Sequence, residues 1–381
     1  MSQYKIASIP GDGIGKEVVP EGMRVIDAAG EKFGFKVNWT QFPFGSEHYL
    51  KTGEILSDAS VKELGKYDSI FLGALGDPRV KPGVLEGGVL LKLRFAFDQY
   101  INLRPVKLLP SIKSPVANKG PAEIDFDVVR ENTEDFYVGI GGRSKKGKSS
   151  AKLEVVRELY KTKFGLDVET DADEIAYQIG MISRAGTERV VKYAFELCKS
   201  KGGKRVTSVD KANVLTNIYG LWREVGEKVA KGYPGIELEH NYVDAITMYF
   251  LTKPEWFDVV VAPNMFGDII TDLGACVQGG IGLAASGNIN PKGVSMFEPV
   301  HGSAPDIAGR GIANPVATIL AGALMIGTLG EKKAADAIVK ATEAVLSEGK
   351  VRTGDLGGKS KTKDVGDAVI SRMARFLKAP T

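Results

Sequence analysis

Short apolar runs alternate with amphipathic stretches along most of the chain. Runs typical of buried strands occur at residues 5–10, 36–44, 68–75, 205–210, 236–244 and 256–263. Patterns typical of helices, with apolar positions three or four residues apart, occur at residues 18–34, 57–67, 188–202, 217–233 and 331–349. Strands separated by helices of this length indicate βαβ units, so the pattern predicts an α/β fold in which helices flank parallel sheets.

Two irregular segments interrupt this pattern. Residues 103–152 carry four prolines followed by a cluster of Gly, Lys and Ser at 139–150. We interpret this segment as a crossover into a second domain, with an exposed arm near 139–152. The Gly- and Pro-rich segment 292–315 is too long for a simple connection, and long ordered loops inside compact domains are usually functional.

The composition is that of a globular protein. Its 381 residues, 43% of them hydrophobic, exceed one ordinary core and predict two domains or one large α/β domain. With 50 Lys and Arg against 47 Asp and Glu, the net charge of +3 is too small for a dedicated nucleic-acid binder. Cys198 and Cys276 cannot form a disulfide framework, no secretory signal is visible, and the longest apolar stretch, 316–329, is too short to cross a bilayer. We therefore expect a soluble cytoplasmic protein with no nucleic-acid and no membrane partner.

Two glycine-rich motifs suggest nucleotide binding. GDGIGK (11–16) follows a strand and precedes a helix, but its third glycine comes one position early for a dinucleotide-binding loop. GRSKKGKS (142–149) matches the P-loop pattern in full, so a P-loop NTPase is an alternative function. The glycine-rich run before it makes a poor buried strand, and its extra basic residues are typical of a solvated turn.

The strongest chemical pattern is acidic. Asp268 and Asp272 stand four residues apart at the start of a helical pattern that directly follows a buried strand. Positions i and i+4 share one helix face, so both carboxylates can face one point beyond the carboxyl edge of the sheet, where ligands of α/β proteins bind. Such oxygen ligands suit Mg²⁺ or Mn²⁺, and Asp244 is a candidate third ligand. The alternative is that Asp268 only favours the helix N-terminus and Asp272 is solvated.

Cationic residues form a second pattern. Arg94 and Arg104 flank an amphipathic segment and Arg130 ends a strand-like run; their rigid guanidinium forks suit carboxylates. Each alone is typical of a surface, but three beside a metal site would form a pocket for a di- or tricarboxylate. Lys211 directly follows a buried strand, where desolvation and a nearby cation would favour the neutral amine and make it a useful base. An ordinary lysine at a strand end is the alternative.

Six ordered segments carry a resemblance to one enzyme family. They are IPGDGIGKEV, LLKLRFAFDQYINLRP, VRENTEDFYVGIGGR, VTSVDKANVL, FGDIITDLGA and FEPVHGSAPDIAGRGIANP. Together they closely resemble the β-decarboxylating dehydrogenases, which act on 3-isopropylmalate, isocitrate, homoisocitrate, tartrate or D-malate. The resemblance implies an α/β, non-Rossmann fold of two domains with parallel or mixed sheets. The cofactor domain would comprise 1–101 and 256–381, and the substrate and dimerisation domain 102–255.

The resemblance also implies the catalytic groups. A divalent metal would be held by Asp268 and Asp272 together with Asp244 of the partner subunit, in a homodimer whose active sites are shared. Asp244 would also border the substrate. Lys211 of the partner subunit would take the proton of the substrate's alcohol, and Tyr137 would protonate the carbanion left by loss of CO₂.

The expected cofactor is NAD. By resemblance, the residues that would bind it are His301, Gly302, Ser303, Ala304, Asp306, Ile307 and Asn314. Asp306 stands where NAD-using members keep an acid that accepts hydrogen bonds from two ribose hydroxyls and would repel the 2′-phosphate of NADP. NADP-using members have a lysine–tyrosine pair where this chain has Asp306 and Ile307.

Within the family, the segment before Arg94 distinguishes the substrates, and the three arginines would bind the carboxylates. Isocitrate enzymes place a serine there and homoisocitrate enzymes an arginine, whereas this chain has Val89, Leu90 and Leu91, with Val214 further along. An apolar wall suits an isopropyl group, so 3-isopropylmalate, converted to 2-oxoisocaproate in leucine biosynthesis, is the expected substrate. Tartrate and D-malate are alternatives because small substrates need no specific wall; isocitrate and homoisocitrate come after them.

Two features stand apart from the family pattern. Asp135 stands where the family usually has a glycine, two positions before Tyr137, so we expect a local backbone conformation that differs from the family's. The basic run 143–148 is either a solvated turn or part of an arm that clasps the dimer partner.

Overall fold

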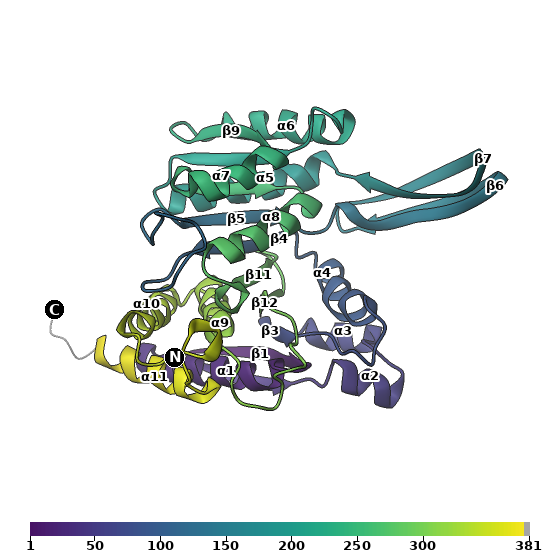
Figure 1. The fold of residues 1–381 in the computed structure, drawn as a ribbon. Coiled ribbons are helices and arrows are strands. Elements are labelled where there is room, and N and C mark those ends of the chain that lie inside the picture. Colours follow the sequence, from purple (N-terminus) through teal and green to yellow (C-terminus); the bar gives the residue numbers. More distant parts are fainter. Residues whose placement is uncertain (377–381) are drawn as a thin grey trace. The chain divides into compact units, whose positions relative to one another are not determined.

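The computed structural model describes residues 1–376, which form two compact units (Figure 1). Unit 1 consists of Met1–Phe126, Phe250–Glu255 and the chain from Thr271 onward; unit 2 consists of Asp127–Tyr249 and Trp256–Ile270. These boundaries differ from the expected divisions at residues 101 and 256, because Phe250–Glu255 belong to unit 1 and Trp256–Ile270 to unit 2. Residues 102–126 belong to unit 1 because β4 (Ile101–Lys107) pairs with β11 (Ala285–Ile289) and the segment after β4 folds back, with the Leu108 amide donating to the Ile124 carbonyl at 2.9 Å.

Unit 1 is built on a mixed sheet with the strand order β2-β1-β3-β12-β11-β4. Its remaining strands are β1 (Ser2–Gly11), β2 (Phe35–Gln41), β3 (Ser69–Ala74) and β12 (Ser295–Pro299). Strands β1, β2, β3 and β12 run parallel, whereas β11 is antiparallel to both β12 and β4. Its helices are α1 (Gly15–Phe33), α2 (Ser46–Thr52), α3 (Asp58–Leu64), the short π-helix η1 (Glu86–Leu91), α4 (Lys92–Ala96), α9 (Val316–Thr328), α10 (Lys332–Glu348) and α11 (Thr362–Phe376).

The alternation of side chains along β3 shows how this sheet is covered on both faces. Ile70 and Leu72 belong to an apolar cluster that includes residues of α3 and α4. Phe71 points to the opposite face, towards Gly22 of α1 and Gly322 of α9. A Cβ at Gly22 would come within 2.9 Å of the Phe71 ring, so glycine is what lets α1 pack this closely. Buried strands covered on both faces account for the continuous apolar runs in the sequence.

Unit 2 contains a parallel sheet with the order β5-β10-β8-β9. These strands are β5 (Asp125–Glu131), β8 (Arg205–Asp210), β9 (Glu237–Tyr242) and β10 (Val259–Ala262). Helices α5 (Arg184–Ser200) and α6 (Thr216–Ala230) pack against this sheet and each other. Unit boundaries fall inside β5, whose first two residues belong to unit 1, and inside α7 (Val243–Thr252) and α8 (Asn264–Val277).

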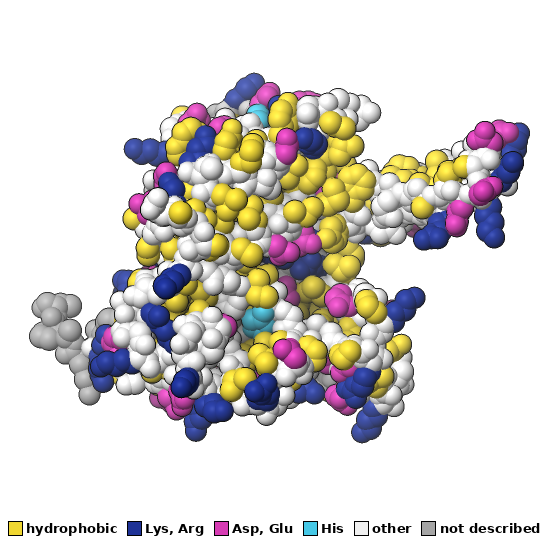
Figure 2. All heavy atoms as spheres, viewed as in Figure 1, with side chains coloured by type: hydrophobic (Ala, Val, Ile, Leu, Met, Phe, Trp, Pro, Cys, Tyr) yellow, Lys and Arg dark blue, Asp and Glu magenta, His cyan; other side chains and the backbone are white. Residues whose placement is uncertain are grey.

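A long two-stranded arm extends from unit 2 (Figure 1). It is formed by β6 (Asp135–Arg157) and β7 (Tyr160–Met181), so the exposed arm expected near 139–152 is confirmed but is longer. Lys and Arg lie next to Asp and Glu at its far end (Figure 2). Arg143 lies 3.6 Å from Glu174, and Lys148 lies 3.4 Å from Glu169. The basic run is therefore balanced by acids on the opposite strand.

Two sequence-based interpretations are wrong. The P-loop pattern 142–149 lies inside strand β6, where Lys148 pairs in register with Glu169, and no helix begins at Lys148. The segment therefore lacks the loop and helix N-terminus with which a P-loop binds phosphate, and we reject the NTPase alternative. The segment 292–315 is not one long loop, because β12 occupies Ser295–Pro299.

The predicted class, an α/β fold with parallel and mixed sheets flanked by helices, is confirmed. None of the helices within residues 1–376 combines the length and the apolar character that crossing a membrane requires.

Candidate functional site

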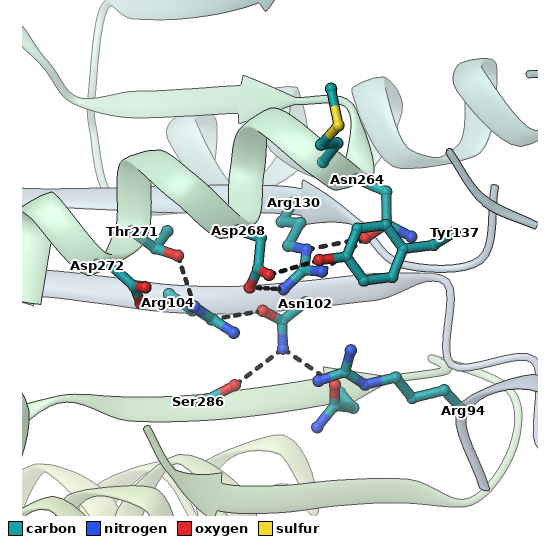
Figure 3. A network of polar contacts seen from close by, with 12 residues as sticks. Arg94, Asn102, Arg104, Arg130, Tyr137, Asn264, Asp268, Thr271, Asp272 and Ser286 are labelled. Carbon is teal, nitrogen blue, oxygen red and sulfur yellow. Dashed lines mark hydrogen bonds and ion pairs between the residues drawn. The ribbon is translucent and has the colours of Figure 1, made fainter. Parts of the chain in front are cut away.

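Three predicted site residues of unit 2 meet around one carboxylate (Figure 3). Arg130 Nη1 lies 2.5 Å from Asp268 Oδ1, and the Tyr137 hydroxyl lies 2.6 Å from Asp268 Oδ2. Arg130 also donates from Nε and Nη2 to Asn264 Oδ1, at 3.0 and 2.7 Å. Since Arg130 is only 1% exposed, these bonds hold its guanidinium in one orientation before any ligand binds.

The local fold explains this arrangement. Strand β10 runs parallel to β5, with Ala262 opposite Arg130, so the chain leaving β10 enters α8 beside Arg130. A Cβ at Gly267 would lie 2.5 Å from Arg130 Cγ, so glycine is needed for the arginine to pass α8. Sequence reasoning missed Asn264; the only signal for it was an amide at the start of a helix that directly follows a buried strand.

Lys211 and Asp244 form a separate pair in unit 2. Lys211 Nζ lies 2.5 Å from Asp244 Oδ1, and this hydrogen bond lowers the pKa of Asp244. Over residues 1–376, no three Asp, Glu, His or Cys side chains are arranged to hold a metal ion. A single chain thus does not gather Asp244, Asp268 and Asp272, and the role of Asp244 in a partner subunit's site stays a prediction.

Arg104 of unit 1 is held by polar neighbours on β4 and α8 (Figure 3). Its Nε donates to Asn102 Oδ1 at 2.7 Å, and its Nη1 donates to Thr271 Oγ1 at 2.5 Å. The Asp272 carboxylate lies 4.0 Å from Nη1 and its side chain is 74% exposed. Asp272 is therefore open to a ligand while Arg104 is fixed.

A chain of buried polar groups joins Arg104 to Arg94 within unit 1. Asn102 Nδ2 donates to Asn288 Oδ1 at 3.0 Å, and Asn288 Nδ2 donates to Glu298 Oε1 at 2.8 Å. Arg94 Nη2 lies 3.5 Å from the same Glu298 oxygen. Because a guanidinium only donates and a carboxylate only accepts, both amide orientations are determined. The sequence analysis missed these amides, which no motif marks.

The predicted apolar wall lies in an unusual element. Val89, Leu90 and Leu91 belong to the π-helix η1, which runs directly into α4 and Arg94. Val89 is fully buried, and Leu90 packs against the same apolar cluster. Short π-helices are rare and are often found at functional sites.

The predicted cofactor loop packs against the turn 11–16 in unit 1. The Ile14 amide donates to the Ser303 carbonyl at 2.8 Å, and a Cβ at Gly13, which has a φ of +51°, would lie 1.9 Å from that oxygen. Ile307 packs against Ile14. Gly13 thus permits close contact with this loop, whereas Gly11 and Gly15 lie against the backbone of Ala74 and Pro10.

The other predicted cofactor residues differ in what they offer a ligand. His301 is 7% exposed, burial lowers its pKa, and its buried Nε2 has no hydrogen-bond partner among residues 1–376. Asp306 is exposed. The Asn314 side chain, in contrast, donates to Asp355 and accepts from the Val316 amide, so its polar groups are already used.

Two hollows lie beside this loop, of about 380 and 310 Å³. Their shared lining residues are Gly76, Asp77 and Pro305. Asp12, which the sequence analysis did not single out, shapes this region: its carboxylate accepts from the Ser46 amide at 2.7 Å and from the Gly76 amide at 3.0 Å. The signal for Asp12 was an acid between two glycines of a strand-to-helix turn.

Two buried acids, Glu131 and Glu134, lie close in sequence to Arg130 and Tyr137. Glu131 accepts from the Thr133 amide at 2.7 Å and from the Glu134 amide at 2.8 Å. Glu134 accepts from the Ser183 hydroxyl at 2.6 Å. Burial and the Glu134 carboxylate raise the pKa of Glu131 from 4.5 to about 7, and burial also raises the pKa of Glu134.

This shift predicts a pH-dependent stability. Between pH 4.5 and about 7 the folded protein binds a proton at Glu131 that the unfolded chain lacks. The stabilisation is complete below pH 4.5 and is lost as the pH rises through 7. The free energy of unfolding should fall by on the order of 1–3 kcal/mol over this range. Urea unfolding from pH 5 to 8 should show this decline, and Glu131→Gln should flatten it. An identical slope in both proteins would contradict the prediction.

The comparisons with known proteins agree with one another. The family model "Isocitrate/isopropylmalate dehydrogenase" matches residues 5–369. The 3-isopropylmalate dehydrogenase of Thermobifida fusca is 48% identical over 97% of this chain and 98% of its own length. The decarboxylating D-malate dehydrogenase of Escherichia coli is 42% identical over 98% of this chain and 100% of its own. The crystal structure of isocitrate dehydrogenase from Methylococcus capsulatus matches with a TM-score of 0.81 at 36% identity, covering 97% of this chain and 99% of that one.

Proposed function

Because the chain belongs to the isocitrate/isopropylmalate dehydrogenase family, we propose that it oxidises 3-isopropylmalate with NAD and releases CO₂ to form 2-oxoisocaproate. The observation that carries the proposal is the cluster in unit 2, where the buried Arg130 guanidinium and the Tyr137 hydroxyl both bind the Asp268 carboxylate. A preorganised cation, a proton donor and an acid on one face are what a decarboxylation of a hydroxy diacid requires.

The donor set fits a divalent metal. Asp268 and Asp272 supply carboxylate oxygens one helical turn apart on α8, which suits Mg²⁺ or Mn²⁺. Asp244 of the partner subunit would complete the set. A bound divalent cation would supply Lewis-acid stabilisation of negative charge on the substrate's oxygens.

The chain's own residues would do the rest. Arg94, Arg104 and Arg130 would hold the carboxylates in fixed orientations, because their guanidinium groups are already locked by buried neighbours. Lys211 of the partner subunit would accept the proton of the substrate's alcohol, and NAD, when bound, would supply the hydride acceptor. Tyr137 would then donate its hydroxyl proton to the carbon that has lost CO₂.

The cofactor loop supports NAD. Within residues 1–376 the buried Nε2 of His301 has no hydrogen-bond partner, and a ligand would satisfy it. The exposed Asp306 carboxylate can accept from ribose hydroxyls and would repel a 2′-phosphate. Asn314 would contribute through its backbone, since its side chain is engaged elsewhere.

A homodimer is part of the proposal. Three large apolar side chains on or next to α6, α7 and α8 are more than half exposed: Val214 at 65%, Met248 at 57% and Ile269 at 57%. Covering these side chains with another chain would remove apolar surface from water. A second copy would cover it and would allow Lys211 to serve the partner's site.

The assay that tests the function is NADH formation at 340 nm with Mg²⁺ or Mn²⁺. Run over 3-isopropylmalate, D-malate, tartrate, isocitrate and homoisocitrate, it should give the highest kcat/KM for 3-isopropylmalate, because η1 presents leucines and no residue to pair a further carboxylate. NADP should be used at least about tenfold less well than NAD. A preference for D-malate would favour the second candidate, which the 42% identical relative supports, and a preference for isocitrate would contradict our assignment of the apolar wall.

A further inference from the structure

Asp135 has a backbone conformation that is uncommon for its residue type. It begins strand β6 with a φ of +63°, in the left-handed region that favours glycine, and it is completely buried. A residue other than glycine in this conformation carries strain, which persists where the surrounding structure holds the residue in place.

The Asp135 carboxylate is held by two contacts within unit 2. Its Oδ1 accepts from the Tyr219 hydroxyl at 3.0 Å, and its Oδ2 accepts from the Met265 amide at 2.9 Å. Tyr219 is a fully buried residue of α6, and Met265 lies in the first turn of α8. The amides of a helix's first turn have no partner inside the helix, so Asp135 satisfies one of them from another segment of the chain.

The hydrogen bond to the Met265 amide links Asp135 to the chain segments that carry two proposed site residues, Tyr137 and Asp268. Tyr137 follows Asp135 by two residues on β6, and Asp268 follows Met265 by three residues on α8. A parallel link runs next to it, because Asn264 Nδ2 donates to the Glu134 carbonyl at 3.3 Å. The start of β6 is thus joined to the start of α8 by two contacts, each within a few residues of the Tyr137 hydroxyl and the Asp268 carboxylate that are bonded to each other.

We propose that Asp135 is a positioning residue of this enzyme: its carboxylate anchors the first turn of α8 and thereby sets Tyr137 against Asp268 for proton delivery. The inference rests on the proposed function, but its structural part holds without it. Asp135 touches neither substrate nor cofactor in this role. Its effect on the reaction should therefore appear in kcat much more than in KM.

Three substitutions distinguish the effect of the positive backbone φ from the effect of the carboxylate's hydrogen bonds. Asp135→Gly relieves the positive φ and removes both hydrogen bonds, Asp135→Ala removes the bonds and keeps the strain, and Asp135→Asn tolerates the φ and keeps one acceptor oxygen. We expect Asp135→Gly to lower kcat roughly 10- to 100-fold with KM changed less than about twofold. Asp135→Asn should recover part of kcat. Asn118→Gly, at an exposed position with a φ of +60°, is the matched control and should leave both constants unchanged.

A second measurement does not depend on activity. In the full-length protein, Asp135→Gly and Tyr219→Phe should each speed hydrogen–deuterium exchange in peptides covering 264–268, and the double variant should add little because both remove the same anchor. Unchanged exchange and unchanged kcat in Asp135→Gly would overturn the proposal. The proposal would also be overturned if, across the three Asp135 variants, the loss of kcat and the rise of KM were both proportional to the loss of thermal stability. If the wild type is inactive but hydrogen–deuterium exchange is faster in Asp135→Gly, the proposed function is rejected. The structural role of Asp135 in holding the first turn of α8 is then still supported.

Discussion

Lys211→Met is expected to lower kcat by roughly 10²- to 10⁴-fold, the usual contribution of a positioned general base. The fold should tolerate the change, because the Asp244 carboxylate that pairs with Lys211 is 66% exposed and can be solvated instead. Stability should therefore stay within about 0.5 kcal/mol of the wild type. Steady-state kinetics at saturating substrate, NAD and metal, together with urea unfolding, measure both effects.

Mixing two inactive variants tests whether Lys211 serves the partner's site. In a hybrid of Lys211→Met and Tyr137→Phe chains, one shared site would contain both intact residues and the other site would contain neither. Refolding the two variants together should restore activity that neither has alone. If both residues act within their own chain, the mixture will stay as inactive as its components.

Asp272→Asn is expected to lower kcat/KM by at least about 10²-fold at 1 mM Mg²⁺, with partial recovery at higher metal concentration. Its side chain is 74% exposed, so the folded state should lose little stability. Asp268→Asn is the matched comparison: it should be as inactive and also less stable, because the buried Arg130 loses its carboxylate partner. Metal titrations with parallel unfolding curves separate the two. Wild-type metal dependence in Asp272→Asn would remove this residue from the proposed ligand set.

The elements of this fold could be predicted where burial governs the pattern. Val259–Ala262 forms β10 within the predicted strand 256–263, because a strand that is buried along its whole length shows a continuous apolar run. The Gly/Lys/Ser cluster predicted an arm but not its length, since β6 and β7 alternate polar and apolar residues in a pattern too weak to mark their ends. The P-loop pattern wrongly indicated nucleotide binding because it specifies residue types only. Phosphate binding also requires a strand before the loop and a helix after it.

The candidate site could be predicted where charge carries the chemistry. Arg130, Tyr137 and Asp268 are brought together in unit 2, although the role of Tyr137 came only from the resemblance. Asn102 and Asn264 were missed because the sequence marks an uncharged amide weakly or not at all, and both amides act by orienting an arginine. Such residues become visible only when the fold places them beside the charges.

The position of β11 and β12 has a consequence for synthesis on the ribosome. Both strands lie between β3 and β4 in the sheet of unit 1, yet they occur near residue 290, long after β3 and β4 have been translated. Until then the nascent chain exposes an unpaired edge of β3, a surface prone to pairing with other chains. Unit 2, whose residues are nearly contiguous, can fold in the meantime. A chain that stops before β12 should therefore have a folded middle and an aggregation-prone beginning.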